Sequence, residues 1–158
     1  MTSRFSSRVR LGAVALTLAL LSLVAFRGTV RAEGIDLSCH GGGRLTDADL
    51  GRGVNIVVVW ASWSPRCHGI AGRVGSLAAR WGSRARVVTV NFQEDGAAVE
   101  RFAGKGLGAP VCLDPDGIFS HNYKIATLPG LVVLKDGQVV YAGKLPDDPD
   151  SVIAPAVR

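Results

Sequence analysis

The stretch from Asn55 to Cys67 constrains the fold more than any other part of the sequence. Residues 56–60 form a continuous apolar run rich in valine, which ends abruptly in Ser-Trp-Ser-Pro at residues 62–65. From residue 70 to residue 81, apolar side chains then recur at helical spacing. A short apolar run bounded by turn residues is typical of a buried strand, and the later spacing is typical of an amphipathic helix. The stretch therefore predicts a buried strand, a tight turn and a helix that packs back on the sheet.

Two residues of the turn fit the start of a helix. Ser64 stands where a helix would be capped, and Pro65 stands in its first turn, where a missing backbone N–H leaves no bond unmade. The thiol of Cys67 then lies one turn into the helix, near the carboxyl end of the strand. Because no His-Asp pair in the sequence marks a base for a serine nucleophile, capping is the favoured role of Ser64.

Residues 60–67, Trp-Ala-Ser-Trp-Ser-Pro-Arg-Cys, resemble the Trp-Ala-x-Trp-Cys-x-x-Cys active-site segment of thioredoxin-like proteins, most closely the exported TlpA/ResA type. The resemblance covers residues 35–145. It implies a thioredoxin-like α/β fold, with a mixed central sheet flanked by helices, an N-terminal β-hairpin and a helix-strand insert. It also implies thiol–disulfide exchange with cysteine-containing exported proteins or a membrane thiol reductant. The resemblance thereby implies Cys67 and Ser64 as the candidate catalytic residues. Since Ser64 replaces the first cysteine of the motif, the expected oxidoreductase activity is reduced or atypical.

A second segment of the resemblance is Thr127-Leu128-Pro129, which is similar to the Thr-x-Pro segment whose cis-proline faces the active cysteines. It implies a cis Leu128–Pro129 bond, and it implies that Leu128 offers backbone groups to an extended substrate strand. Trp63, Pro65, Leu128 and Pro129 are therefore expected to form a substrate groove. The alternative for this segment is an ordinary turn before a strand.

The resemblance leaves the proton-handling acid of such sites unassigned. At the two positions where relatives carry this acid, the sequence has Val58 and Ile70. Cys67 is therefore either an exchanging thiol without a dedicated acid or an inert, structural thiol, and the sequence leaves both open.

Three cysteines follow the N-terminal segment, namely Cys39, Cys67 and Cys112. An odd number in an exported protein implies at least one free thiol or an intermolecular bridge. All three pairings are open in sequence, and we favour a structural bridge between Cys39 and Cys112. The Cys-His pairs at residues 39–40 and 67–68, with His121, also raise a copper carrier similar to the Sco type. Its Cys-x-x-x-Cys spacing is missing, so we predict no metal and no other cofactor.

The net charge of +5 has a local origin. Residues 1–32 contain five arginines and no acid, so the remainder is formally neutral and nucleic-acid binding is not expected. Basic residues followed by the apolar run 11–26 are typical of a signal peptide, and an uncleaved anchor is the alternative. Either places a monomeric thioredoxin-like domain, residues 33–150, outside the cytoplasm. It would be periplasmic or otherwise exported, or anchored to the outer face of the inner membrane.

The remaining segment, residues 151–158, is predicted to be a short C-terminal tail or helix interrupted by Pro155. For the function, three hypotheses remain. The favoured one is thiol–disulfide exchange or redox maturation of partner proteins through an atypical Ser-x-x-Cys site. The alternatives are a non-catalytic binding or assembly module that uses the same groove, and the copper carrier.

Overall fold

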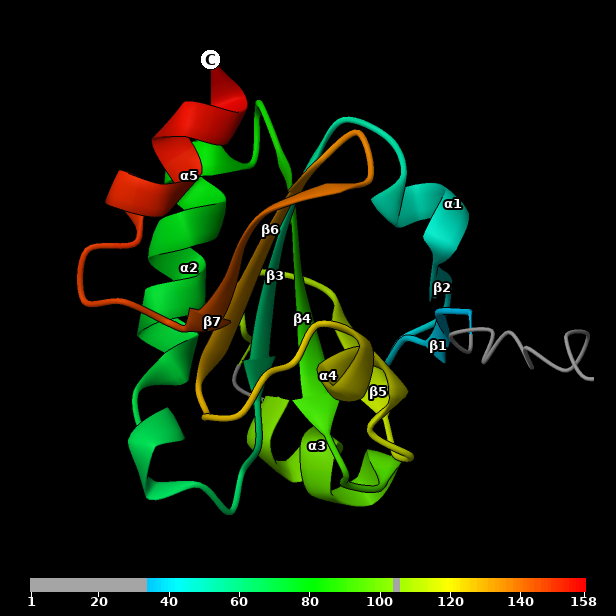
Figure 1. Cartoon of the computed structure of the whole chain (residues 1–158). Helices are drawn as coiled ribbons and strands as arrows, with labels where there is room; N and C mark the ends of the chain where they lie inside the picture. The colour runs from blue at the N-terminus through cyan, green and yellow to red at the C-terminus, as the bar shows by residue number, and fades with distance from the viewer. Residues whose placement is uncertain (1–33, 104–105) are drawn as a thin grey trace, which may run out of the picture. The chain divides into compact units, whose positions relative to one another are not determined.

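The computed structural model describes residues 34–103 and 106–158, and a five-stranded mixed sheet lies at its centre (Figure 1). The strands are, in chain order, β3 (Val54–Trp60), β4 (Arg86–Phe92), β5 (Val111–Asp114), β6 (Gly130–Lys135) and β7 (Gln138–Lys144). Their order in the sheet is β5-β4-β3-β6-β7. β4 is parallel to both β3 and β5, whereas β6 is antiparallel to both β3 and β7. The apolar run therefore forms the central strand, as predicted.

Alternate side chains of β3 point to opposite faces of the sheet, as in any β-strand. Ile56, Val58 and Trp60 join the core on one face, and Val57 and Val59 join the core on the other. All five residues are completely buried. Because β3 is covered on both faces and paired along both edges, an uninterrupted apolar sequence is what this position requires.

Three helices supply the core on the Trp60 face, namely α2 (Ile70–Trp81), α3 (Gly96–Ala103) and α5 (Asp150–Val157). The buried side chains of α2 recur at helical spacing and are Ile70, Val74, Leu77 and Trp81. In Figure 1, α2 and α5 lie together on the left of the sheet. The Asp95 carboxylate accepts a hydrogen bond from the Ala98 N–H at 2.8 Å, which caps the start of α3.

The C-terminal helix α5 continues through Pro155, which the sequence predicted to interrupt it. Proline in the interior of a helix removes one hydrogen bond and crowds the preceding turn, so the cost must be offset. Here Ile153 and Ala156 are buried against the sheet, and this packing holds the short helix together.

The opposite face carries the N-terminal hairpin and two short helices. In Figure 1 the hairpin and the first of these helices lie to the right of the sheet. Their bounds are β1 (Asp36–Ser38), β2 (Arg44–Thr46), α1 (Asp47–Leu50) and α4 (Ile118–Asn122). At the start of α1, Thr46 and Asp49 form a capping box. The hydrogen bonds from Thr46 lower the pKa of the Asp49 carboxyl, and the nearby Arg86 guanidinium, at 3.0 Å, acts in the same direction.

The predicted leader, residues 1–32, lies outside the described residues. Within residues 34–103 and 106–158, none of the helices has the length and hydrophobicity needed to cross a lipid bilayer. The prediction of a cleaved signal peptide or an anchor therefore stays a prediction.

Candidate functional site

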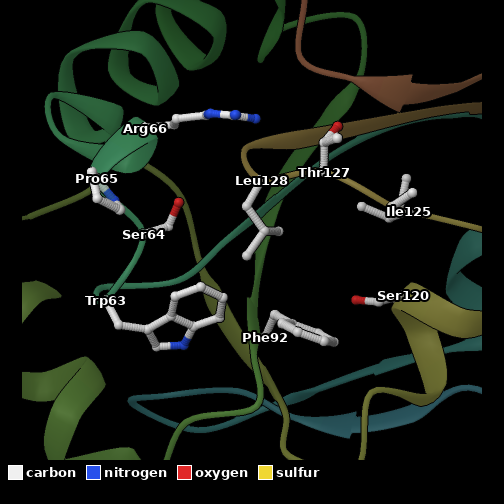
Figure 2. A pocket seen from close by; sticks show the side chains of 10 residues that line it. Trp63, Ser64, Pro65, Arg66, Phe92, Ser120, Ile125, Thr127 and Leu128 are labelled. Carbon is white, nitrogen blue, oxygen red and sulfur yellow. The ribbon is translucent and has the colours of Figure 1, made fainter.

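A groove opens at the carboxyl end of β3, between the turn that follows this strand and the loop that leads into β6 (Figure 2). The turn is a 3-10 helix, η1 (Pro65–Cys67). The groove has a volume of about 540 Å³. Its lining residues come from residues 63–66, from Phe92 and Ser120, and from residues 125–128. We use the name "groove" for this pocket below.

Three of the four residues predicted for a substrate groove line it, namely Trp63, Pro65 and Leu128. Pro129 is not among its lining residues, although the Leu128–Pro129 bond is cis, as the Thr-x-Pro resemblance implied. Trp63 is 60 % exposed, which is unusual for the largest apolar side chain. Its ring and Phe92 lie on the same side of Leu128 in Figure 2. An exposed aromatic ring at the mouth of a groove is typical of a binding surface.

The backbone of residues 126–128 forms one wall of the groove and has unused hydrogen-bonding capacity. Within the described part of the chain, the N–H and C=O groups of these three residues form no hydrogen bond. Pairing resumes only at Pro129, whose carbonyl accepts a bond from the Leu145 N–H at 2.9 Å. Exposed, unpaired backbone groups next to a sheet can take an extended peptide as an additional strand.

The two predicted catalytic residues have different environments. Ser64 lines the groove and is 6 % exposed. Cys67 is 1 % exposed, does not line the groove, and packs in the core beneath it with Trp60 and Ile70. A molecule bound in the groove therefore meets a hydroxyl rather than a thiol.

The start of the helix differs from the prediction. The turn that begins at Ser64 and Pro65 ends after three residues, and α2 begins only at Ile70. Gly69 lies between them with φ 77°, a left-handed conformation that other residues adopt only at a cost. Ser64 forms no side-chain capping bond, and its carbonyl instead accepts the Cys67 N–H at 2.9 Å. Cys67 is therefore at the end of a separate turn and not within the first turn of α2.

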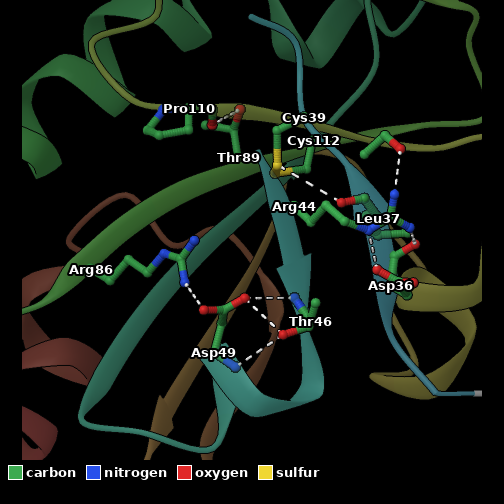
Figure 3. The surroundings of a disulfide bond; sticks show 11 residues. Asp36, Leu37, Cys39, Arg44, Thr46, Asp49, Arg86, Thr89, Pro110 and Cys112 are labelled. Carbon is green, nitrogen blue, oxygen red and sulfur yellow. Dashed lines mark hydrogen bonds and ion pairs between the residues drawn. A yellow bond between two sulfur atoms is a disulfide. The ribbon is translucent and has the colours of Figure 1, made fainter. Parts of the chain in front are cut away.

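A disulfide joins Cys39 to Cys112 across a sequence separation of 73 residues (Figure 3). The two residues are antiparallel bridge partners with Cα atoms 3.8 Å apart, so the disulfide attaches the N-terminal hairpin to β5. Cys112 packs on the α4 side of the sheet, whereas Cys67 packs on the α2 side. The sheet separates them, and Cys67 is the free cysteine of the described residues.

One acidic side chain that contacts the motif has no counterpart among the residues predicted from the sequence. The Glu94 carboxylate accepts hydrogen bonds from the Ser62 N–H at 2.6 Å and from the Asn91 side-chain amide at 2.7 Å. The Ser62 hydroxyl also donates to it. Asn91 is completely buried. Glu94 thus fixes the loop between β3 and η1, two residues before Ser64.

A comparison with protein families decides the family of the chain. A family model described as Redoxin matches residues 26–156. This chain belongs to the Redoxin family. A search of curated proteins found no match for this Redoxin-family sequence.

Solved structures similar to this Redoxin-family chain share its fold. A putative thiol:disulfide interchange protein DsbE from Chlorobium tepidum has 21 % identity and a TM-score of 0.70, covering 81 % of this chain and 96 % of that chain. The exposed lipoprotein thioredoxin Etrx1 from Streptococcus pneumoniae has 21 % identity and a TM-score of 0.66, with 78 % and 98 % covered. A secreted Mycobacterium tuberculosis disulfide oxidoreductase has 22 % identity and a TM-score of 0.59, with 66 % and 79 % covered. The predicted thioredoxin-like α/β fold is confirmed.

Two further sequence hypotheses concern a metal site and a proton-handling acid in this Redoxin-family protein. Within the described residues, no group of three or more His, Cys, Asp and Glu side chains is placed to hold a metal ion. Val58 and Ile70, the two positions at which the resemblance implied an acid, are buried in the core and contribute packing. The carboxylate that does reach the loop is Glu94, and its partners there are Ser62 and Asn91.

Replacing Glu94 with alanine is expected to loosen the loop that carries Trp63 and Ser64. The substitution leaves the donors of Ser62 and Asn91 without their acceptor, and the Asn91 side chain is buried. We expect the free energy of unfolding to fall by about 2 kcal/mol, the range for lost hydrogen bonds to a charged group. Urea denaturation measures this change, and hydrogen exchange of the Ser62 amide should become faster.

The matched control for this experiment is Glu100→Ala, which removes an exposed glutamate from α3. It should leave both the unfolding free energy and the exchange of the Ser62 amide unchanged. Equal behaviour of the two variants would show that Glu94 does not fix the loop.

Proposed function

We propose that this Redoxin-family protein acts in the thiol–disulfide maturation of partner proteins by binding extended segments of them in the groove, without itself starting disulfide exchange. One observation carries this proposal. Ser64, which the motif resemblance matches to the attacking cysteine, lines the groove, and the thiol of Cys67 is 1 % exposed and outside the groove lining. The thioredoxin-like fold and the neighbours named as thiol–disulfide proteins support the redox context.

The binding part of the proposal rests on the two kinds of contact that the groove offers. The free backbone groups of residues 126–128 suit the main chain of an extended segment. Trp63, Phe92 and Leu128 suit an apolar side chain of that segment. Main-chain pairing gives affinity for many sequences, and the apolar surface adds preference for some of them.

We expect no exchange activity because neither the Ser64 hydroxyl nor the Cys67 thiol is suited to attack a substrate disulfide. Disulfide exchange needs a thiolate that reaches a substrate sulfur in line with its S–S bond. A serine hydroxyl does not ionise near neutral pH without a base, and no base is within hydrogen-bond distance of Ser64 in the described residues. Cys67 reaches no bound substrate from its buried position.

We also propose that the protein works outside the cytoplasm. The basic and apolar pattern of residues 1–32 is typical of an export signal, and the Cys39–Cys112 disulfide is typical of an oxidising compartment. Two of the similar structures are described as an exposed lipoprotein and as a secreted protein, which agrees with this location.

The proposal predicts binding without reduction. A fluorescein-labelled, fully alkylated polypeptide should bind the pure protein, as measured by fluorescence anisotropy. The variant Trp63→Ala should weaken this binding about tenfold, because an exposed tryptophan at a groove is a typical hot spot. The control Val139→Ala removes a side chain that is 52 % exposed on β7, away from the groove lining, and should bind as the wild type does. In parallel, the wild type should not catalyse insulin reduction by dithiothreitol.

Insensitivity of the binding to Trp63→Ala, or an equal effect of Val139→Ala, would overturn the assignment of the groove. Catalysed insulin reduction by the wild type would instead overturn the claim that exchange does not start here.

A second candidate function is exchange through Cys67, and the short turn favours it. Cys67 ends a three-residue 3-10 helix that Gly69 separates from α2. Two backbone bonds hold this turn, from the Cys67 N–H to Ser64 and from the His68 N–H to Pro65. Because local opening breaks so few bonds, a bound partner with a reactive disulfide would be able to form a mixed disulfide with Cys67. Trapping of such a species with wild type, and its loss in Cys67→Ala, would support this candidate.

A further inference from the structure

Arg66 is the one charged side chain among the residues that line the groove, all of which belong to the described ranges. It is exposed on η1. Figure 2 shows its side chain extending toward the Thr127 side of the groove, with Leu128 between it and the rings of Trp63 and Phe92. The groove therefore has a cationic side and an aromatic side.

Several other arginines of the described residues have partners of their own. Arg44, Arg80 and Arg86 form ion pairs with aspartates. Arg66, by contrast, forms no ion pair or hydrogen bond with any residue in the described part of the chain. Its charge is thus not used by the fold and is available to a molecule in the groove.

The rest of the lining does not compete with this charge. Ser64, Ser120 and Thr127 contribute hydroxyl groups, and the other lining residues are apolar. A positively charged ligand side chain would face Arg66 without a carboxylate to compensate it. A negatively charged side chain would form a charge-assisted hydrogen bond with the guanidinium.

We propose that the groove selects extended segments in which an acidic side chain lies two residues from a large apolar side chain. This inference rests on the proposed function, namely the binding of an extended segment along residues 126–128. In an extended strand, side chains at positions i and i+2 share one face. The apolar side chain then packs against Trp63 and Phe92, and the acidic side chain reaches Arg66. The direction of the bound strand sets whether the acid precedes or follows the apolar residue.

A peptide library with a fixed central phenylalanine and blocked ends tests this selection. The immobilised full-length protein retains binders, and sequencing counts Asp and Glu at the second position on either side of the phenylalanine. We expect about fivefold enrichment of acids at one of these positions, the upper end for a partly exposed ion pair. The enrichment should disappear with Arg66→Gln and persist with Arg101→Gln, which changes an exposed arginine of α3 outside the groove lining. Raising the salt concentration should reduce it.

The outcomes separate this inference from the proposed function. If peptides are retained by the wild type and lost with Trp63→Ala, but acids are not enriched, binding in the groove stands and the selection by Arg66 is wrong. Enrichment that persists in Arg66→Gln also overturns the selection. If the wild type retains no more peptide than Trp63→Ala, both the proposed function and this inference are overturned.

Discussion

Removing the Cys39–Cys112 disulfide is expected to lower the free energy of unfolding by about 4 kcal/mol. The disulfide closes a separation of 73 residues, and the chain-entropy model gives about 4 kcal/mol for a loop of that length. This is a large share of the roughly 5–15 kcal/mol that holds a typical domain in its native state. The double variant Cys39→Ala/Cys112→Ala, unfolded by urea with the wild type alongside it, measures the difference.

The effect should be concentrated where the disulfide attaches the hairpin to β5. Asp114, in the same strand as Cys112, is completely buried and accepts hydrogen bonds from the backbone of Phe119 and Ser120 and from the Ser120 hydroxyl. Ser120 in turn lines the groove. Greater mobility of β5 is therefore transmitted through α4 to the groove. Hydrogen exchange at Phe119 and Ser120 should become faster in the double variant.

Cys67→Ala provides the control for this experiment. It removes a buried sulfur but no cross-link, so we expect only the cost of a small cavity, about 1 kcal/mol. A double variant no less stable than Cys67→Ala would show that the disulfide does not constrain the unfolded chain as the model assumes.

Much of the fold could be predicted from the sequence because local patterns specify it. The apolar run of β3 has the composition of a strand buried on both faces, and the β-branched residues of β4 have the same character. Asp136-Gly137 joins β6 to β7 with both residues at positive φ, as a tight hairpin turn requires. Each of these signals lies within a few residues of the structure that it determines.

The start of α2 could not be predicted by the same means, because two signals compete there. Ser64 and Pro65 have the residue types of a helix start, and they do start a turn. Gly69 then adopts a left-handed conformation, which ends that turn and sets the direction of α2. A glycine four residues after a proline is the one local sign of this break, and glycine at that position is equally compatible with a continuous helix.

The contacts that complete the candidate site depend on residues far apart in sequence. Glu94 meets Ser62 across a separation of 32 residues, and no local pattern connects them. The pairing of Cys39 with Cys112 depends on which face of the sheet each cysteine occupies, a choice that spacing alone leaves open. The environment of Cys67 likewise follows from the packing of Trp60 and Ile70 around it.

Restoring the first motif cysteine with Ser64→Cys is expected to convert the groove into a working exchange site. The new thiol would face the groove beside Arg66, whose positive charge favours a thiolate. Residue 64 directly precedes η1 and Cys67 ends it, one turn away, so we expect Cys67 to attack the mixed disulfide. That attack releases the reduced substrate and leaves a disulfide in the protein, which dithiothreitol reduces again. Insulin reduction should rise at least about hundredfold over wild type, since loss of a nucleophile commonly costs far more than that.

The resolving step can be separated with a second variant. Ser64→Cys/Cys67→Ala should form a stable mixed disulfide with a substrate but should not turn over, because no second thiol releases the product. If Ser64→Cys alone is as inactive as the wild type while remaining folded, then the absence of a thiol at residue 64 is not the reason why the protein lacks exchange activity. The left-handed break at Gly69 and the lack of an acid at Val58 and Ile70 would then be the features that separate this site from an active one.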